Sequence, residues 1–301
     1  MSAIVAASHD RSYPHEVSYA RSWLYVPGDR ADFLRAAATR GTDALIIDLE
    51  DSVRPADKDA ARATVAAWLA DNPPQATELW LRLNSGSAAA DLRLLTAGVA
   101  GVVVPKAEPD LLGQVGEILA SQERMLGLRA GSFAVVPLIE TARGLLSAGR
   151  LASMQRVAHL GIGEADLCAE LRIRPSTDGT ELVPLRLQVV VASAAAGIGA
   201  PIAPTSTNFR DLEAFLASTQ ALLRAGFRAR TAIHPAQIPV INEVFSPSAE
   251  EVAEARLLVD AFGRAPAGVI TDASGRMVDV AVVRSARELL GRADRAGRGH
   301  S

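Results

Sequence analysis

FAVVPLIE, residues 133 to 140, is a run of apolar residues that ends in a carboxylate, and GVVVP, residues 101 to 105, is a second apolar run. Neither run alternates apolar with polar residues, which is typical of strands covered on both faces in a parallel sheet. Similar short runs recur at residues 22–26, 44–48, 79–83 and 157–162, and two weaker ones at 200–203 and 231–234. The chain is therefore expected to contain eight strands.

Amphipathic stretches lie between these runs. Residues 61–69 and 111–119 place their Ala, Val, Leu and Trp side chains at helical spacing. Eight alternations of strand and helix predict an α/β fold, a (β/α)8 TIM barrel, with an open doubly wound sheet as the alternative. Polar residues follow most of the strands. We favour the barrel because it gathers all these strand ends around one mouth, whereas an open sheet spreads them along a line.

The barrel is expected to occupy residues 19–246, after a flexible N-terminal tail of residues 1–18. Residues 247–301 follow it. They predict a helix over 249–262, a short extended pair around Ser274 and Gly275, and a final helix over 282–293. Because this extension is too short to fold alone, we expect it to pack on the barrel or on a neighbouring subunit, as a lid or an oligomerisation element.

The composition excludes several classes of protein. The 31 basic and 34 acidic residues are nearly balanced and no stretch concentrates basic residues with aromatics, so nucleic acid is not an expected partner. The sequence has no run of roughly 20 apolar residues and no basic, apolar leader at its start, so neither a membrane span nor secretion is expected. The single Cys168 is expected to be a buried, inert thiol in a cytoplasmic protein.

Two carboxylates, Glu140 and Asp166, each follow a short apolar run and lie 26 residues apart, about one strand and one helix. In a parallel barrel they would emerge side by side at the carboxyl edge, where a hard cation such as Mg²⁺ could bridge them. Two protein ligands would leave positions open for a chelating substrate. The alternative is an ordinary ion pair, for instance between Glu140 and Arg143. There is no His and Cys cluster that would suggest zinc.

A second acidic cluster, Asp48, Glu50 and Asp51, follows the strand at 44–48. Such crowding requires compensating donors, so these acids could form the outer shell of a metal site and accept hydrogen bonds from bound water. Alternatively, they cap the helix that follows Pro55. We count Glu50 among the candidate catalytic residues.

Arg82 lies in an apolar strand, where an unpaired cation is costly to bury. Its guanidinium could bind a substrate carboxylate through two hydrogen bonds, or it could pair with Glu50 or Glu140 and only support the site. Lys106 could form a Schiff base, which would indicate an aldolase without a metal, but the acids favour metal chemistry. His234 could be a base or a ligand, although the Ile233-His234-Pro235 context favours a role in fixing a loop.

Several motifs occur together and in order along residues 21 to 294. They are Arg21-Ser22-Trp23-Leu24-Tyr25-Val26-Pro27-Gly28-Asp29-Arg30, Asp48-Leu49-Glu50-Asp51-Ser52-Val53, Arg82-Leu83-Asn84, Pro137-Leu138-Ile139-Glu140-Thr141, the Gly-x-x-Asp ending at Asp166, Ile233-His234-Pro235-Ala236-Gln237 and Gly275-Arg276-Met277-Val278-Asp279. In these motifs the chain resembles the citrate lyase β-subunit-like (CitE-like) group of the HpcH/HpaI aldolases.

The resemblance implies a TIM barrel that uses Mg²⁺, or Mn²⁺ in its place, to cleave or form a carbon–carbon bond in 3-hydroxyacyl thioesters such as malyl-CoA, citramalyl-CoA or a citryl thioester. It implies Glu140 and Asp166 as metal ligands and Arg82 as the residue that holds the 2-oxo acid. It implies Asp279 as the acid that a C-terminal lid delivers to a neighbouring subunit, and hence a homotrimer or a higher homo-oligomer. Gly28, His234 and Gln237 match motif positions expected to bind substrate.

The chain departs from the group's pattern toward the region where relatives hold the thioester carrier. Ala203 and Asn208 stand where aspartates are common, Ala229 and Arg230 replace a Gly-Lys pair, and Ala194 replaces a frequent arginine. The acyl group and the direction of the reaction are therefore left open. Three alternatives also stay open: a subunit of a citrate lyase complex, a metal-dependent pyruvate aldolase acting on CoA-free substrates, and a non-catalytic barrel subunit.

Overall fold

The computed structural model describes residues 18–37, 39–71, 77–264, 270–271 and 277–298. The predicted tail up to residue 17 and the predicted turn at Ser274 and Gly275 lie outside the described residues. The chain divides into two compact units, one ending at Ile241 and one beginning at Asn242. No helix in the described part of the chain is both long and apolar enough to cross a membrane.

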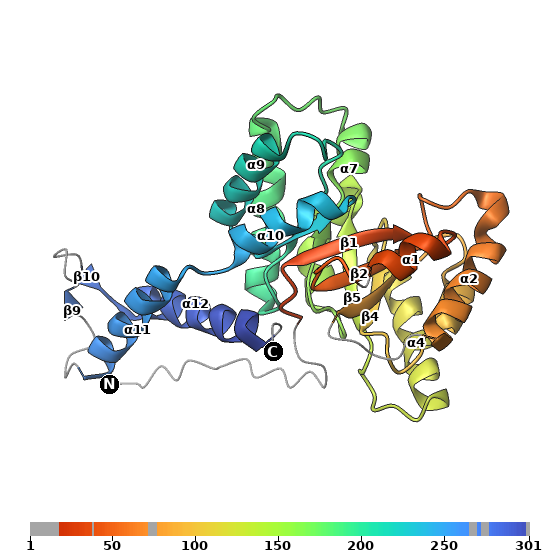
Figure 1. The fold of residues 1–301 in the computed structure, drawn as a ribbon, viewed down its shortest axis with the longest axis horizontal. Helices are drawn as coiled ribbons and strands as arrows, with labels where there is room; N and C mark the ends of the chain where they lie inside the picture. Colours follow the sequence, from red (N-terminus) through yellow and green to blue (C-terminus); the bar gives the residue numbers. More distant parts are fainter. Residues whose placement is uncertain (1–17, 38, 72–76, 265–269, 272–276, 299–301) are drawn as a thin grey trace. The chain divides into compact units, whose positions relative to one another are not determined.

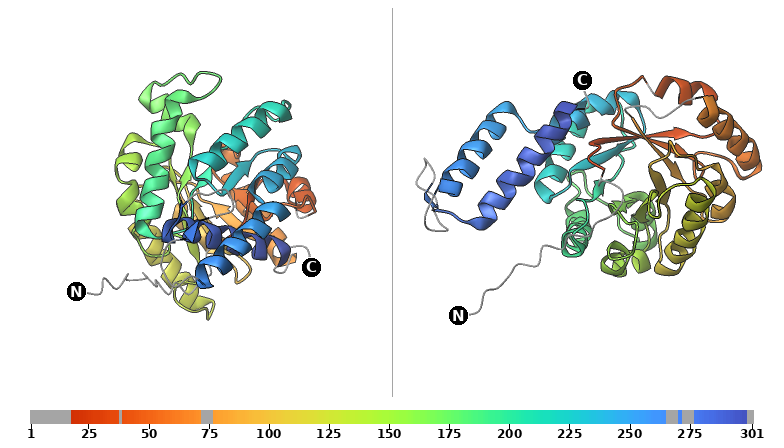
Figure 2. Two further views of the ribbon diagram at one scale, coloured as in Figure 1. Left: turned by 90° about the vertical axis from the view of Figure 1, so that its left-hand side faces the viewer. Right: turned by 90° about the horizontal axis from the view of Figure 1, so that it is seen from below.

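The first unit is a closed barrel of eight parallel strands in sequential order, as predicted (Figure 1). The strands are β1 (Ser22–Pro27), β2 (Ala44–Asp48), β3 (Glu78–Arg82), β4 (Gly101–Val104), β5 (Ala134–Ile139), β6 (Gly161–Ile162), β7 (Ile202–Ala203) and β8 (Ala229–Ala232). The views in Figure 2 show helices around the outside of this ring of strands. The helices cover the outer faces of the strands, which accounts for their continuous apolar character.

The helices of this unit follow the strands. They are α1 (Ala31–Ala37), α2 (Lys58–Asp71), α3 (Ala88–Asp91), α4 (Pro109–Met125), α5 (Ala142–Leu146), α6 (Ala148–Ala152), α7 (Glu164–Leu171), α8 (Val183–Ala196), α9 (Leu212–Ala225) and α10 (Ile238–Phe245), with 3-10 turns η1 (Pro55–Asp57), η2 (Leu92–Leu94), η3 (Thr180–Leu182) and η4 (Pro235–Gln237). The boundary between the two units falls within α10, after Ile241. The predicted amphipathic faces are confirmed: α2 buries Ala61, Val65, Trp68 and Leu69. Thr141 starts α5, since its side chain accepts a hydrogen bond from Gly144 N.

Side chains of the barrel strands form the buried core. Trp23 and Trp80 pack together with ring centroids 4.9 Å apart, and Ile46, Val103 and Val136 join the same cluster. Strand register then decides which polar residues meet at the mouth. Pro27 is the partner of Asp48 and Asp48 is the partner of Arg82, so three adjacent strands end side by side. Between β5 and β6, Ile139 is the partner of Ile162, which brings Glu140 beside Gly163.

Several strand boundaries differ from the prediction, most at β6, β7 and β8, and β7 starts two residues later than the predicted 200–203. The run at 157–162 forms regular strand only at Gly161 and Ile162, with one isolated bridge from Val157 to Val135. The last strand lies two residues earlier than the predicted 231–234, because buried Arg230 belongs to it. Hydrogen bonds to Pro204 O and Thr219 Oγ1 satisfy this guanidinium, which also lies over the ring of Phe215. An apolar pattern does not identify such a residue as part of a strand.

The second unit contains α11 (Ala249–Arg264), β9 (Ile270–Thr271), β10 (Met277–Val278) and α12 (Val280–Arg298). The two helices lie side by side, and the two short strands pair antiparallel, with Met277 opposite Thr271 (Figure 1). Asp279 directly precedes α12 and caps it, because its Oδ1 accepts hydrogen bonds from the N–H groups of Ala281 and Val282.

Candidate functional site

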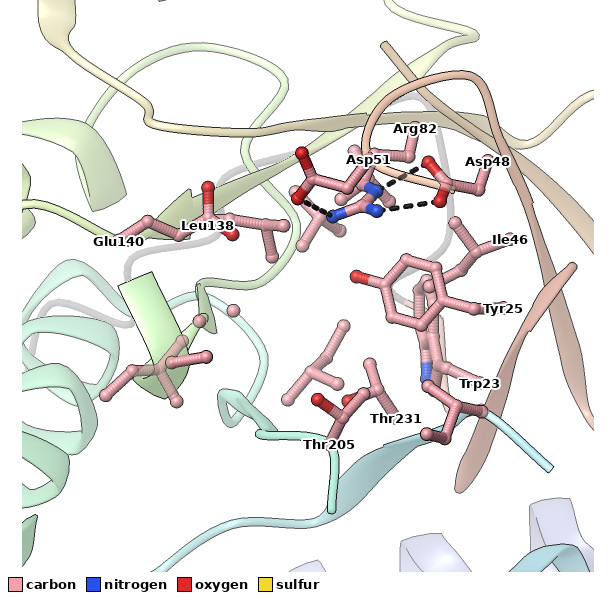
Figure 3. Close-up of a pocket in the computed structure, with 18 of the residues that line it drawn as sticks. Trp23, Tyr25, Ile46, Asp48, Asp51, Arg82, Leu138, Glu140, Thr205 and Thr231 are labelled. Carbon is pink, nitrogen blue, oxygen red and sulfur yellow. Dashed lines mark hydrogen bonds and ion pairs between the residues drawn. The ribbon is translucent and has the colours of Figure 1, made fainter. Parts of the chain in front are cut away.

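A cavity of about 430 Å³ opens where the strands of the first unit end (Figure 3). Apolar side chains from several strands form one part of its wall, and polar side chains that follow β2, β3, β5 and β6 form another. The lining residues include Trp23, Tyr25, Ile46, Asp48, Asp51, Arg82, Val103, Val136, Leu138, Glu140, Glu164, Asp166, Ile202, Ala203, Thr205, Thr231 and Ile233. The position at the carboxyl ends of the strands is the one at which TIM barrels carry out their chemistry.

The guanidinium of Arg82 forms two parallel hydrogen bonds with Asp48, each 2.7 Å long (Figure 3). Burial alone would raise the pKa of Asp48, but the bonds and charge of Arg82 outweigh it and hold that pKa below its usual value. The sequence predicted that Arg82 needs an anionic partner. Asp48 is that partner, with Glu50 as a second, and no ion pair to Glu140 occurs in the described residues.

Tyr25 lies beneath this pair, with its ring centroid 4.9 Å from Arg82 Cζ (Figure 3). Burial raises the pKa of the phenol, so Tyr25 stays protonated and can donate a hydrogen bond into the cavity. The sequence pattern alone did not single out Tyr25 as a site residue. The alternation of side chains along β1 was the available signal, since it points Trp23, Tyr25 and Pro27 to the same side.

Glu50 is buried between two cations. Its Oε1 accepts a hydrogen bond from Lys106 Nζ at 2.9 Å, while its Oε2 lies 2.9 Å from Arg82 Nη1 at an angle that makes an ion pair but no hydrogen bond. Burial raises the pKa of Glu50 despite both cations, so its charge is only partly compensated. Glu50 is not among the residues that line the cavity, but it contacts Arg82, which is.

Glu140 follows β5 and is buried at the cavity wall. Its Oε2 accepts a 2.7 Å hydrogen bond from the backbone N–H of Lys106. Burial, reinforced by the charge of Glu50, raises the pKa of Glu140 to about 7. Gly163 is required beside it, because a Cβ atom at that position would lie 2.5 Å from Glu140 Oε1.

Asp166 lies in the first turn of α7 and also lines the cavity. Its Oδ2 is 3.3 Å from Lys106 Nζ. Glu140 and Asp166 therefore both face the cavity and both contact Lys106, one through the backbone and one through the side chain. Within the described residues, no group of three or more His, Cys, Asp or Glu side chains is arranged as a metal cage.

Lys106 is held as an ammonium group. Burial lowers its pKa, but the bond and charge of Glu50 outweigh burial and raise the pKa overall. A Schiff base needs a neutral amine, so this environment disfavours the Schiff-base alternative for Lys106.

Glu164 is a further charged residue of the cavity that the sequence analysis did not single out. It forms two hydrogen bonds with Arg186 of α8, at 2.5 and 2.8 Å. Because Arg186 already neutralises it, Glu164 adds little net charge to the site.

Three predicted substrate-binding residues are not among those that line the cavity. Gly28 donates its backbone N–H to Asp48 O, and so supports the loop that holds Asp48. His234 accepts a hydrogen bond from Ala236 N and stacks on Phe209, and Gln237 accepts from Ile233 N and donates to Ser206 O. These contacts fix loops around the mouth, and a direct contact with substrate stays a prediction for all three.

Asp279 belongs to the second unit, where it caps α12, and its predicted delivery to the site of a neighbouring subunit stays a prediction. The departures near β7 bear on the cavity more directly. Ala203, Thr205 and Ile233 all line the wall, and all three side chains are apolar or neutral.

Comparisons with known proteins match this architecture. The family model described as HpcH/HpaI aldolase/citrate lyase matches residues 21–235. The citrate lyase subunit beta of Escherichia coli is 32% identical, with 92% of this chain and 94% of the relative covered, and the mitochondrial citramalyl-CoA lyase of Rattus norvegicus is 28% identical, with 92% and 86% covered. The crystal structure of CitE from Mycobacterium tuberculosis with magnesium, acetoacetate and coenzyme A has a TM-score of 0.73 and 30% identity, and covers 91% of this chain and 98% of that one. The chain belongs to the HpcH/HpaI aldolase/citrate lyase family and is a carbon–carbon lyase.

Proposed function

We propose that this protein is a Mg²⁺-dependent lyase that cleaves 3-hydroxyacyl thioesters into a 2-oxo acid and an acyl thioester, or condenses the two. The main support is the meeting of Arg82, Glu140 and Asp166 around one cavity at the carboxyl ends of the strands. The relatives add to it, since one is named for citramalyl-CoA and another was crystallised with magnesium, acetoacetate and coenzyme A.

The donor set fits a magnesium ion. Carboxylate oxygens are the ligands that Mg²⁺ prefers, and two of them leave positions for water and a chelating substrate. Burial, with the charge of Glu50 as a smaller cause, raises the pKa of Glu140 to about 7, and a bound divalent cation would favour its ionised form. Glu140 and Asp166 would hold the ion. When bound, it would act as a Lewis acid on the oxygens of the 2-oxo acid.

Arg82 would bind the carboxylate of the 2-oxo acid. Asp48 accepts hydrogen bonds from Nε and Nη2, and Nη1 is ion-paired with Glu50 and Asp51 without a hydrogen bond to either. The second N–H of Nη2 and the N–H groups of Nη1 are the donors that a substrate carboxylate would use. The bidentate pair with Asp48 fixes the plane of the guanidinium, so little side-chain entropy is lost on binding. Arg82 thus both orients the substrate and stabilises the oxygen charge of the product.

Cleavage requires a base that removes the proton of the 3-hydroxyl group. The electrons of the O–H bond then form the carbonyl of the 2-oxo acid, and those of the carbon–carbon bond pass to the thioester fragment as an enolate, which takes up a proton. Asp279 of the C-terminal unit is assigned as the proton carrier at the substrate, and Glu50, which does not line the cavity, would relay the proton. Asp279 would act in a homo-oligomer, a trimer or larger, whose size light scattering can measure.

An activity screen tests the substrate class. The purified chain alone is mixed with malyl-CoA, citramalyl-CoA and the corresponding CoA-free hydroxy acids, with MgCl₂ or with EDTA, and the 2-oxo acid is measured. We expect turnover of a CoA ester that EDTA abolishes. Turnover of free hydroxy acids alone would favour a pyruvate aldolase, and inactivity on all CoA esters would favour a subunit that works on an acyl-carrier protein or a non-catalytic role.

Magnesium is expected to raise the melting temperature more at about pH 8 than at about pH 6. Because the folded-state pKa of Glu140 is raised to about 7, the metal-free folded protein binds more protons than the unfolded chain between the ordinary carboxyl pKa and 7. Its stability therefore falls as pH rises through that window, and Mg²⁺ restores stability by binding the ionised form. Melting curves at constant ionic strength measure this difference, and an equal shift at both pH values would argue against Glu140 as a ligand.

Replacing Gly163 by alanine is expected to weaken Mg²⁺ binding about tenfold while the fold is kept. The added Cβ would overlap Glu140 Cγ and Oε1, so the carboxylate must move. Gly113→Ala is the matched control, because a Cβ there meets nothing within 4 Å on α4, and alanine should stabilise the helix by roughly 0.5–1 kcal/mol. Calorimetric titration with MgCl₂ reports both affinities, and unchanged affinity in Gly163→Ala would contradict the placement of Glu140.

A further inference from the structure

The chain has only two lysines, Lys58 and Lys106, among its 31 basic residues. The other 29 are arginines. Both lysines nevertheless contact the same residue, Glu50: Lys58 donates to its backbone carbonyl at 2.6 Å, and Lys106 donates to its carboxylate at 2.9 Å. Both lysine ammonium groups of the chain therefore lie beside Glu50.

Lys106 contacts three carboxylates that come from three different parts of the barrel. Its ammonium lies 2.9 Å from Glu50 Oε1 and 3.3 Å from Asp166 Oδ2, and its backbone N–H binds Glu140. Its φ of 46° is in the left-handed region, which a residue other than glycine adopts only at a cost. The barrel thus holds a strained backbone at the point where these acids meet.

The two acids bound by this ammonium differ in freedom. The Glu50 side chain is 7% exposed and is also held by Arg82, whereas the Asp166 and Lys106 side chains are 46% and 41% exposed. The contact with Asp166 is also the longer one. An ammonium group can therefore leave Asp166 for solvent while it keeps Glu50, and a rigid guanidinium fork is less suited to such an exchange.

We propose that Lys106 is a positioning residue that competes with the divalent cation for Asp166. In the metal-free protein its ammonium neutralises Glu50 and Asp166 and keeps the carboxylates from repelling one another. When the cation binds, Lys106 releases Asp166 and keeps Glu50 in contact with Arg82. The inference rests on the proposed function, since it takes Asp166 as a ligand of the ion.

Removing the competing charge should strengthen binding of the cation. Two like charges a few ångströms apart repel each other appreciably even at a solvent-exposed site, so we expect Lys106→Met to bind Mg²⁺ about tenfold more tightly than wild type. The backbone N–H to Glu140 stays in this variant. Lys106→Arg keeps the charge and should bind Mg²⁺ no more tightly than wild type. The metal-free Lys106→Met protein should melt at a lower temperature, because its carboxylates lose a counter-ion.

Lys58→Met is the matched control. It removes one charge near Glu50. Lys58 Nζ donates hydrogen bonds to the carbonyl oxygens of Leu49 and Glu50, and within the described residues it forms no ion pair with a carboxylate. Calorimetric titration of metal-free wild type and the three variants with MgCl₂ tests the proposal, with melting curves as a measure of folding. We expect tighter binding in Lys106→Met alone.

The outcomes distinguish failure of the metal assignment from failure of the role proposed for Lys106. If wild type binds no Mg²⁺, the metal assignment fails and the role of Lys106 fails with it. If wild type binds but Lys106→Met binds no more tightly, or Lys58→Met or Lys106→Arg tightens equally, only the role of Lys106 is overturned. Reductive ¹³C-methylation gives a second reading without substitution, because only two lysines and the terminal amine are labelled. The Lys106 signal should shift on addition of MgCl₂, and an unchanged signal would overturn the competition.

Discussion

Replacing Glu140 by glutamine is expected to lower kcat by more than roughly a thousandfold and to remove measurable Mg²⁺ binding. Glutamine keeps the size of the side chain and an oxygen that can accept the N–H of Lys106, but it lacks the charge that holds a hard cation. Asp166→Asn should have the same effect, since it removes the second carboxylate of the pair. Turnover with MgCl₂ and calorimetric titration measure the two losses.

The metal-free stability of Glu140→Gln provides the control. At about pH 8 the wild-type carboxylate is ionised although burial opposes its charge, so the neutral amide should melt at the same temperature as wild type or higher. Loss of activity in a protein that is at least as stable cannot be ascribed to unfolding. Full activity in either Glu140→Gln or Asp166→Asn would contradict the assignment of these residues as ligands.

Arg82→Lys is expected to lower kcat/KM by roughly a hundredfold to a thousandfold. Lysine keeps the charge but cannot bind Asp48 through two parallel bonds and present further donors to a substrate carboxylate at the same time. The loss should appear in both kcat and KM for the CoA ester in the cleavage direction, because the interaction orients the substrate and stabilises the product oxygens.

Arg156→Lys is a matched control for this substitution. The Arg156 and Arg82 side chains are each 12% exposed, and Arg156 also forms a two-bond pair with a buried carboxylate, that of Glu123, away from the cavity. We expect Arg156→Lys to lower the melting temperature with little change in kcat/KM. Equal losses of activity in the two variants would mean that Arg82 only supports the fold.

The fold was predictable because its signal is local. Most strands of the barrel are short apolar runs, and the amphipathic spacing of Ala61, Val65 and Trp68 marks the helix that follows β2. The last strand was placed two residues late, because Arg230 is buried through neutral hydrogen bonds and aromatic contact, and no apolar pattern reveals this.

The site was predictable in part. Glu140, Asp166 and Arg82 stood out because charged residues at the ends of apolar strands converge in a barrel. Which charges pair with one another depends on register and side-chain reach, so neither the partnership of Arg82 with Asp48 nor the contacts of Lys106 with three acids could be derived from spacing. Alternation along β1 could have placed Tyr25 on the same side as Trp23 and Pro27, but its contact with Arg82 depends on the neighbouring strands.

A crystal structure of the protein soaked in MnCl₂, with anomalous diffraction recorded at the manganese edge, tests the central claim most directly. Manganese binds oxygen ligands in the same octahedral manner as magnesium and is visible by its anomalous signal. We predict one strong peak within about 2.2 Å of a carboxylate oxygen of Glu140 and of Asp166, beside the guanidinium of Arg82. A peak bound elsewhere, or the lack of any peak between these two acids in a fully soaked crystal, would contradict the account.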